Sequence, residues 1–93
     1  MTLLLKDPDA VLDYMVDWGA DYLGGDAIAQ SRWDVSPIES GGAEVSGSGH
    51  DYLTATAQVI GGIPGKLYRV TNCIVTASGR EDCRSIMLRV EAR

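Results

Sequence analysis

Two alternating segments near the C-terminus restrict the fold of this chain more than any other feature. Apolar and polar side chains alternate over residues 68–74 and again over residues 86–90, and the turn-forming stretch Ala77-Ser78-Gly79-Arg80 lies between them. A period of two is typical of strands with one buried face, and two such strands around a short turn predict a β-hairpin. The predicted core positions of this hairpin are Tyr68, Val70, Ile74, Ile86, Leu88 and Val90.

The remaining sequence predicts further short strands. They are expected at residues 11–18, 27–35, 43–45 and 52–60, and the third is expected between flexible glycine-rich turns. A helix that starts behind Asp7-Pro8 is an alternative for residues 11–18, since proline suits the first turn of a helix and aspartate its cap. About seven short strands without a convincing helical segment predict an all-β fold, a sandwich of short antiparallel strands.

Alternation also predicts which side chains of the N-terminal strands are buried. In residues 27–35 it places Ala29, Trp33 and Val35 on the apolar face and leaves Ile28 on the polar face. Because the period is two, a slip of one residue would exchange the two faces. The predicted core positions in this part of the chain are Leu12, Tyr14, Val16, Trp18, Trp33 and Val35.

The length of the chain, 93 residues, supports one domain. We expect residues 11–93 to form it and residues 1–10 to form an N-terminal arm or an edge strand. The apolar run Leu3, Leu4 and Leu5 is too short for a signal-peptide core or a membrane span, so synthesis in the cytoplasm is expected and a membrane partner is not. Because apolar side chains are costly to leave in water, these leucines are candidates for strand pairing or for burial against a neighbouring protein.

The charge of the chain is negative overall and unevenly distributed. The net charge of −5 argues against a nucleic-acid partner, because such binding needs a basic surface that displaces counterions. Residues 1–51 contain ten acidic and two basic side chains, whereas residues 52–93 contain three acidic and six basic ones. Either the two halves neutralise each other within the fold, or complementary surfaces dock identical or neighbouring subunits.

No pattern in the sequence indicates catalysis. The single histidine, His50, lies beside Asp51 in a glycine- and serine-rich segment, and no serine has the context of a nucleophile elbow. The N-terminal aspartates do not have the spacing of an EF-hand loop, and neither Gly24-Gly25 nor Gly61-Gly62 is followed by phosphate-binding residues. We therefore expect no enzyme activity, no cofactor and no metal site.

Two cysteines fall within the predicted hairpin. If its loop consists of Ala77-Ser78-Gly79, Cys73 lies directly opposite Cys83, at a separation that a disulfide can bridge. A two-residue turn at Ser78-Gly79 would instead pair Cys83 with Ile74. Because the cytoplasm keeps thiols reduced, we expect a reduced pair in the cell that oxidises after release, with two ordinary thiols as the alternative.

Several short motifs occur in a recognisable order along nearly the whole chain. They are Lys6-Asp7-Pro8-Asp9, Leu12-Asp13-Tyr14, Asp17-Trp18, Leu23-Gly24-Gly25-Asp26-Ala27-Ile28, Trp33, Tyr68-Arg69-Val70-Thr71-Asn72, Ser78-Gly79-Arg80 and Arg84-Ser85-Ile86. In this order and spacing they resemble a family of small structural proteins of tailed bacteriophages, which includes fibre-tail adaptor proteins. The resemblance implies an immunoglobulin-like fold and a place in the virion, after synthesis in the cytoplasm of the bacterial host.

The function that the resemblance implies is that of a non-enzymatic adaptor or connector subunit at the neck or tail of the particle. Expected partners are other virion proteins, namely a tail or neck ring, the portal or a fibre, together with further copies of the same chain. The alternatives are a capsid decoration or cement protein bound to the major capsid protein, and a module that binds carbohydrate on the host surface. The candidate partner-binding residues are Leu3, Leu4, Leu5, Tyr22, Gly41, Gly42 and His50.

Overall fold

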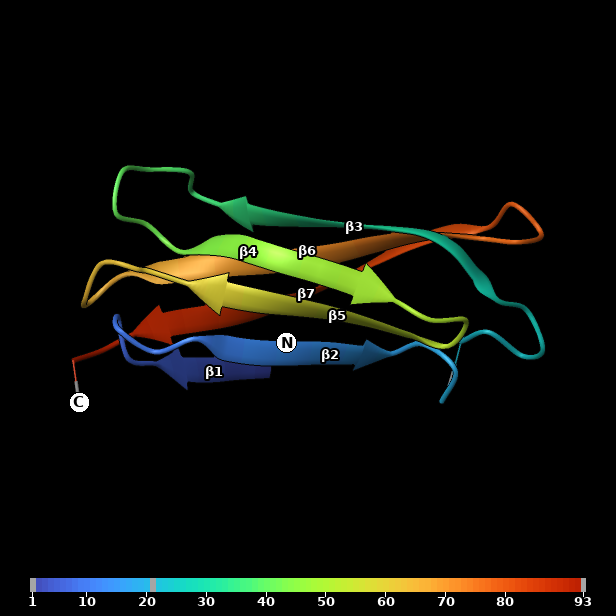
Figure 1. Cartoon of the computed structure of the whole chain (residues 1–93), viewed down its shortest axis with the longest axis horizontal. Coiled ribbons are helices and arrows are strands. Elements are labelled where there is room, and N and C mark those ends of the chain that lie inside the picture. Colours follow the sequence, from blue (N-terminus) through green and yellow to red (C-terminus); the bar gives the residue numbers. More distant parts are fainter. Residues whose placement is uncertain (1, 21, 93) are drawn as a thin grey trace.

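The computed structural model of the chain describes residues 2–20 and 22–92. The strands of these residues are β1 (Thr2–Lys6), β2 (Leu12–Asp17), β3 (Ile28–Ser36), β4 (Glu44–His50), β5 (Thr54–Ile60), β6 (Leu67–Thr76) and β7 (Glu81–Val90). They form a four-stranded sheet in the order β1-β7-β6-β3 and a three-stranded sheet in the order β2-β5-β4, and one sheet lies over the other (Figure 1). The predicted all-β sandwich is therefore confirmed. Among the described residues there is no helix that is long and apolar enough to span a membrane.

The β6–β7 hairpin has the predicted register. Val70 lies opposite Ile86, and the Thr76 amide donates to the Arg80 carbonyl, which leaves residues 77–79 as the three-residue loop of the hairpin. The side chains that alternation assigns to the core of this hairpin are at most 3% exposed. The two-residue turn that would have paired Ile74 with Cys83 is therefore wrong.

Residues 11–18 form a strand and not the alternative helix. β2 pairs antiparallel with β5 along its whole length. Val16 and Trp18 are buried, and Leu12 and Tyr14 are partly exposed but pack against the core. The outcome follows the period-two alternation of this segment, which gives a strand one buried face and one solvated face.

The space between the sheets is filled by two adjoining clusters of apolar side chains, one around Tyr68 and the other around Trp18. All predicted core positions lie in these clusters or pack against them. Several further core residues were not predicted from the alternation in the N-terminal strands and the C-terminal hairpin. They are Leu23, Ile28, Ala43, Ala55, Ala57 and Val59.

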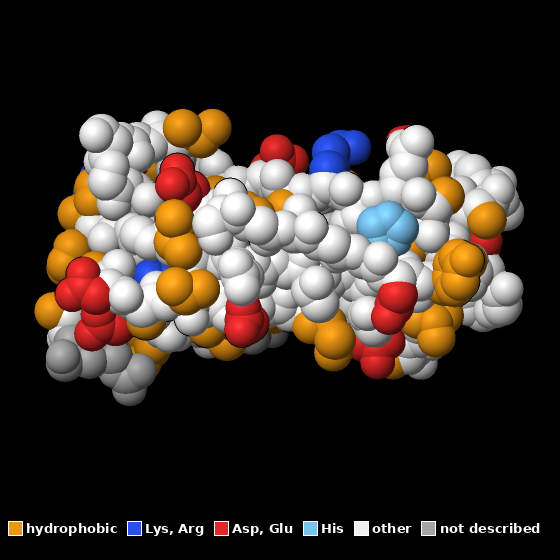
Figure 2. Space-filling view, viewed as in Figure 1, with side chains coloured by type: hydrophobic (Ala, Val, Ile, Leu, Met, Phe, Trp, Pro, Cys, Tyr) orange, Lys and Arg blue, Asp and Glu red, His pale blue; other side chains and the backbone are white. Residues whose placement is uncertain are grey.

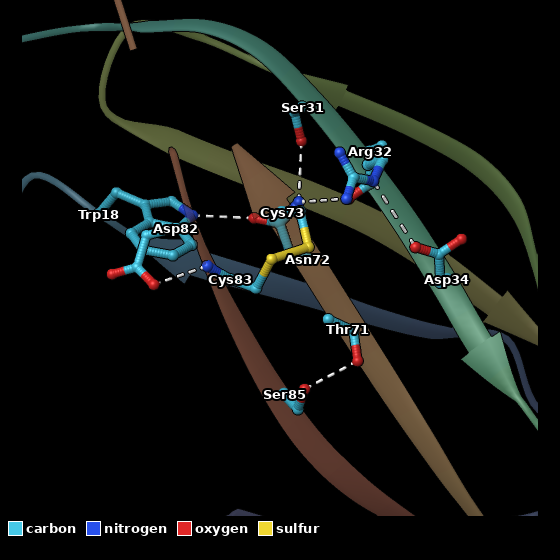
Figure 3. Close-up of a disulfide and its surroundings, with 10 residues drawn as sticks. All are labelled: Trp18, Ser31, Arg32, Asp34, Thr71, Asn72, Cys73, Asp82, Cys83 and Ser85. Carbon is cyan, nitrogen blue, oxygen red and sulfur yellow. Dashed lines mark hydrogen bonds and ion pairs between the residues drawn. A yellow bond between two sulfur atoms is a disulfide. The ribbon is translucent and has the colours of Figure 1, made fainter. Parts of the chain in front are cut away.

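A buried hydrogen-bond network joins the two sheets next to the Trp18 cluster. The Trp18 indole Nε1 donates to Asn72 Oδ1 at 2.8 Å, and Asn72 Nδ2 donates to Ser31 Oγ at 2.9 Å and to the Arg32 carbonyl at 3.0 Å (Figure 3). Asn72 is fully buried on β6. Because a buried amide is costly unless it is hydrogen-bonded, this network fixes the position of Trp18 against the four-stranded sheet.

One prediction about β3 is wrong, because the strand contains a bulge. The register with β6 shifts between Ile28 and Gln30, so that the intervening residue, Ala29, has no direct partner. Ile28 is therefore buried, whereas Ala29 is exposed. A bulge adds one residue to a strand and exchanges the faces on either side of it, which strict alternation does not anticipate. Trp33 and Val35, beyond the bulge, face the core as predicted.

β4 is longer than predicted and contains glycines that were expected in turns. It extends from Glu44 to His50 and pairs antiparallel with β5, with a bulge between Val45 and Gly47. Gly47 and Gly49 therefore lie within a strand. Glycine is a poor strand former, but backbone hydrogen bonds to β5 and a bond from the Thr56 hydroxyl to the Gly49 carbonyl hold this part of the edge strand.

The N-terminal residues form an edge strand of the four-stranded sheet. β1 pairs with the C-terminal half of β7, from Thr2 opposite Ile86 to Lys6 opposite Val90, and the two strands are parallel. The expectation that all strands pair antiparallel is wrong for this pair. Alternation within a strand indicates which faces are apolar, but it does not indicate which strand is its partner or in which direction the partner runs.

Candidate partner-binding surfaces

The outer face of the four-stranded sheet carries an exposed patch of leucine, methionine and arginine side chains. The register places them in two rows across β1, β7 and β6, Leu3, Met87 and Arg69 in one row and Leu5, Arg89 and Leu67 in the other. Leu3, Leu5 and Leu67 are each about half exposed. We call these side chains the Leu–Arg patch. Apolar side chains grouped on a sheet face in this way are typical of a surface that binds another protein.

The three N-terminal leucines that were predicted to bind a partner do not point in the same direction. Leu3 and Leu5 project from the outer face of the sheet as part of the Leu–Arg patch. Leu4 projects between the sheets and packs against the core cluster around Tyr68. The difference follows from the geometry of a strand, in which successive side chains face opposite sides.

The outer face of the three-stranded sheet contains a shallow hollow of about 550 Å³. Its outward lining includes Asp13, Met15, Gly47, Gly49, Thr56 and Gln58, and we call this set the glycine hollow. The hollow is open because glycine has no side chain, and a Cβ placed on Gly49 would have no atom within 4 Å. Figure 2 views this face, on which backbone and uncharged polar side chains predominate.

The two outer faces differ in charge. The strands of the three-stranded sheet contain the acidic residues Asp13, Asp17 and Glu44, and their sequences include no lysine or arginine. The Leu–Arg patch contains two arginines, of which Arg89 forms an ion pair with Glu91 at 2.7 Å. The sandwich therefore presents an acidic face with a hollow on one side and an apolar, basic patch on the other.

Part of the uneven charge is neutralised within the fold. Asp26 pairs with Arg80 at 3.2 Å, and Glu39 pairs with Lys66 at 3.1 Å. Each pair joins an acidic residue of the N-terminal half to a basic residue of the C-terminal half. The two explanations for the charge distribution are therefore compatible, since these two pairs involve neither Asp13 and Asp17 on one sheet face nor Arg69 on the other.

Tyr22 lies in the connection between β2 and β3, where other side chains enclose it. Its ring meets the Trp18 ring edge-on, with the ring centroids 5.3 Å apart. The Arg80 guanidinium lies 4.8 Å from the centroid of the Tyr22 ring and donates to the Leu23 carbonyl at 2.9 Å. Tyr22 therefore helps to hold this connection in place, and only part of its surface is available to a partner.

Asp26 organises the same end of the molecule. Its carboxylate accepts hydrogen bonds from the Ser78 hydroxyl, the Ala27 amide and the Arg80 guanidinium. These bonds, that of Ser78 first, hold the pKa of Asp26 well below its ordinary range. Because the bonds favour the charged form, Asp26 stays ionised and fixes the connection after β2 against the turn between β6 and β7.

The predicted glycine pair between β3 and β4 has two different environments. Gly41 is exposed and has a φ of 76°, a conformation that favours glycine. Gly42 is buried, and a Cβ on it would lie 2.8 Å from Glu39 Cγ. The most exposed apolar side chain of this connection is Ile38, which is 93% exposed. Gly42 is therefore a packing residue, whereas Gly41 and Ile38 are accessible to a partner.

His50 ends β4 and is exposed. Its ring Nδ1 lies 2.9 Å from the carbonyl oxygen of Asp51. The Asp51 carboxylate accepts hydrogen bonds from the amides of Leu53 and Thr54, which lower its pKa. Asp51 thus closes the turn between β4 and β5, and His50 stands at the edge of that turn. The described residues hold no group of three or more His, Cys, Asp and Glu side chains suited to binding a metal ion.

Cys73 and Cys83 lie directly opposite each other in the β6–β7 hairpin. A disulfide joins them, and their Cα atoms are 4.0 Å apart (Figure 3). The bond lies on the outer face of the sheet, because Ile74 and Ile86 occupy the inner one. It connects the two strands where β7, over residues 81–85, extends beyond the part that pairs with β1.

The predicted partner-binding residues are distributed over separate parts of the molecule. Leu3 and Leu5 lie on the outer face of the four-stranded sheet. The connection that holds Gly41 and Gly42 lies at one end of the sandwich, whereas the loop after β2 and the end of β4 lie at the opposite end (Figure 1).

Sequence reasoning missed most of the Leu–Arg patch and the exposed Ile38. The hairpin register already placed Leu67 and Met87 on its outward face, which was an available signal, but nothing indicated that β1 adds its leucines beside them. For Ile38 the available signal was a large apolar residue within a segment otherwise rich in turn residues.

Comparison with known protein families identifies the family to which this chain belongs. The family described as "Podophage GP4 fiber-tail adaptor protein gp77" matches residues 6–89. The chain belongs to this family. The resemblance inferred from the order of the motifs is therefore confirmed, and with it a structural role in the phage virion. A search of the curated proteins found no match.

As a member of a fibre-tail adaptor family, the chain interacts with other tail proteins of the phage. The match begins at the last residue of β1 and ends just before the last residue of β7. It therefore includes both arginines of the Leu–Arg patch and the whole glycine hollow, but not Leu3 and Leu5. Those two leucines belong to the part of the patch that lies outside the matched region.

Proposed function

We propose that this chain is a non-enzymatic adaptor subunit that joins a tail fibre to the tail or neck of a podophage particle. The observation that carries the proposal is the match of the fibre-tail adaptor family to residues 6–89. In this role the protein is made in the cytoplasm of the bacterial host, is incorporated in several copies, and binds a ring subunit of the tail or neck on one side and a fibre on the other.

The form of the molecule supports this proposal. An adaptor needs a rigid body with more than one binding surface, because it must hold two partners at a fixed distance. The sandwich has a continuous core, a disulfide in its longest hairpin and separate surfaces on its two faces and at its ends. Ile38, at one end, and Tyr52, at the other, are large exposed side chains that suit contact with a protein partner.

A catalytic role is not part of the proposal. A general base must lie within hydrogen-bond reach of a group that it activates, and its pKa must suit the task. His50 contacts the carbonyl oxygen of Asp51, and the Asp51 carboxylate is engaged by backbone amides of the same turn. Both side chains are thus used in closing the end of a β-hairpin.

Deletion of the gene from a phage that carries it tests the proposal. Particles without this protein should have filled heads and tails but lack fibres in electron micrographs, and the wild-type gene supplied in the host should restore the fibres. Particles that keep their fibres would overturn the proposal. Fragile heads with intact fibres would favour a decoration protein, and intact particles with weaker binding to host glycans would favour a carbohydrate-binding module.

A further inference from the structure

We infer that the glycine hollow of one copy receives the Leu–Arg patch of a second copy, so that copies of the chain stack face to face. The inference rests on the proposed presence of several copies in the particle and names the surfaces through which they meet. It concerns a contact between identical chains, which is separate from the attachment of the fibre.

The shapes of the two surfaces are complementary. The Leu–Arg patch presents Leu3, Leu5 and Leu67 as side chains that stand out from the sheet and are each about half exposed. The glycine hollow presents two positions without side chains, Gly47 and Gly49, within a depression of about 550 Å³. Protruding apolar side chains that enter a hollow lose water from both surfaces, which favours association.

The charges of the two surfaces are also complementary. Arg69 and Arg89 lie among the leucines of the patch, diagonal to each other on neighbouring strands, and because Arg89 already pairs with Glu91, Arg69 provides most of the positive charge of the patch. Asp13 lines the hollow, and Asp17 follows it on the outward face of β2. A patch placed over a hollow therefore brings arginine towards aspartate, and such complementarity sets the orientation of an interface and suppresses wrong pairings.

The same charges disfavour the two symmetric arrangements. If patch met patch, the arginines of one copy would face the arginines of the other. If hollow met hollow, aspartates would face aspartates, together with Glu44 at the start of β4. Like charges in contact are destabilising, so the favoured contact is heterologous, with a different surface used by each copy. A heterologous contact leaves one patch and one hollow free, and it therefore continues into a ring or a row.

The faces are large enough for a specific contact. The molecule measures 41 by 21 Å across the view of Figure 2 and is 17 Å thick, so each sheet occupies one of its broad sides. A standard interface buries about 800 Å² on each partner. Face-to-face stacking can reach that area, whereas a contact between the narrow ends of the sandwich cannot.

Sedimentation velocity of the purified protein at rising concentration tests the inference. The wild-type chain should associate reversibly, and the association should weaken as salt rises, because salt screens the arginine–aspartate contacts. The substitution Gly49→Leu fills the hollow, and since nothing lies within 4 Å of its Cβ, the fold should tolerate it. It should weaken association by about tenfold or more, as should the double change Leu3→Glu with Arg69→Glu.

A matched control separates a specific contact from a general effect of added charge. Ile38→Glu replaces a side chain that is even more exposed than Leu3 with the same acidic group, but it lies outside both surfaces. It should associate as the wild type does. Circular dichroism and thermal unfolding of each variant show that the sandwich is retained.

Mixing the two variants tests the heterologous arrangement directly. Gly49→Leu keeps an intact patch, and the Leu3→Glu, Arg69→Glu chain keeps an intact hollow. At a concentration at which the wild type associates, neither variant should associate alone, but an equal mixture should form a dimer that grows no further, because only one intact patch and one intact hollow remain. Wild-type protein that stays monomeric up to millimolar concentration, or a mixture that stays monomeric, would overturn the inference. Either result would leave the fibre-tail adaptor role intact, since that role is tested by the loss of fibres.

Discussion

The two ends of the sandwich are held together in different ways. At the end that contains the β5–β6 connection, backbone packs so closely that side chains are excluded, since a Cβ on Gly61 would lie 2.7 Å from the Gly42 carbonyl oxygen. At the opposite end, side chains make the links, with Asp26 bound to Ser78 and Arg80. We call the first the glycine end and the second the Asp26 end. The glycine end should be intolerant of substitution, whereas the Asp26 end should respond to pH.

A buried lysine strengthens the contrast. Lys6, at the glycine end, is 2% exposed, and its Nζ donates to the carbonyl oxygens of Asp7 and Gly61 at 2.8 Å each. Burial lowers the pKa of Lys6, an effect opposed by the nearby carboxylates of Asp7 and Asp9. The hydrogen-bond acceptors of this ammonium are thus backbone carbonyl groups, which do not titrate, whereas the links of Asp26 depend on the charge of a carboxylate.

The largest expected effect is that of Gly62→Ala at the glycine end. Gly62 has a φ of 112°, and a Cβ on it would lie 2.5 Å from Cγ2 of the fully buried Val90. Backbone strain and overpacking together should lower the free energy of unfolding by about 3 kcal/mol. Urea unfolding measures this loss. Gly65→Ala is the matched control, because its φ is 86° but nothing lies within 4 Å, and it should cost about 1 kcal/mol.

The next effect is that of breaking the Cys73–Cys83 disulfide, which lies in the part of the hairpin nearest the Asp26 end. The bond spans a sequence separation of 10 residues, and closing a loop of that size stabilises a fold by at most about 3 kcal/mol through the entropy of the unfolded chain. Reductant should lower the unfolding midpoint of the wild type. The Cys73→Ala, Cys83→Ala chain should unfold at one midpoint with and without reductant. An equal response of both proteins to reductant would contradict a role for the bond.

The smallest effect is the response of Asp26 to acid. Its pKa in the folded protein lies below the ordinary value of about 3.9, so its hydrogen bonds stabilise the fold above that pH, and the stabilisation is lost as pH falls through the folded-state pKa. Between about pH 6 and about pH 2 the wild type should therefore lose more thermal stability than Asp26→Asn, which does not titrate. Glu39→Gln, at the glycine end, should reduce the loss of thermal stability in acid by less than Asp26→Asn does, because only Tyr68 and Lys66 lower the pKa of Glu39. If the thermal stability of Asp26→Asn and that of the wild type fall equally with pH, the claim that the Asp26 end responds to pH is contradicted.

Sequence reasoning succeeded where strand pairing is local. The β6–β7 register followed from alternation and a three-residue loop, which together bring Cys73 opposite Cys83. It failed where pairing joins distant segments, as in the parallel contact of β1 with β7, or where a bulge exchanges the faces, as at Ala29. It also read Gly47 and Gly49 as turn residues, because their place in β4 depends on backbone bonds to β5 and not on their own preference.

The candidate surfaces show the same difference between features that are local in the sequence and features that depend on the pairing of distant strands. Leu3 and Leu5 were found from their composition alone, as an apolar run that water would not favour. Their neighbours in the Leu–Arg patch come from the other end of the sequence, and the pairing of β1 with β7 brings them together. The glycine hollow is formed by missing side chains on three strands, and such a shape is evident only once the sheet is assembled.

The copy number of this protein in purified particles tests its assignment to the tail most directly. Quantitative mass spectrometry, with isotope-labelled peptides of this chain, of the tail fibre and of the major capsid protein as internal standards, gives the ratio of the three proteins. A fibre-tail adaptor should occur at a small whole-number ratio to the fibre protein and far below the capsid protein. A copy number that matches that of the capsid protein, and does not follow that of the fibre, would contradict the assignment.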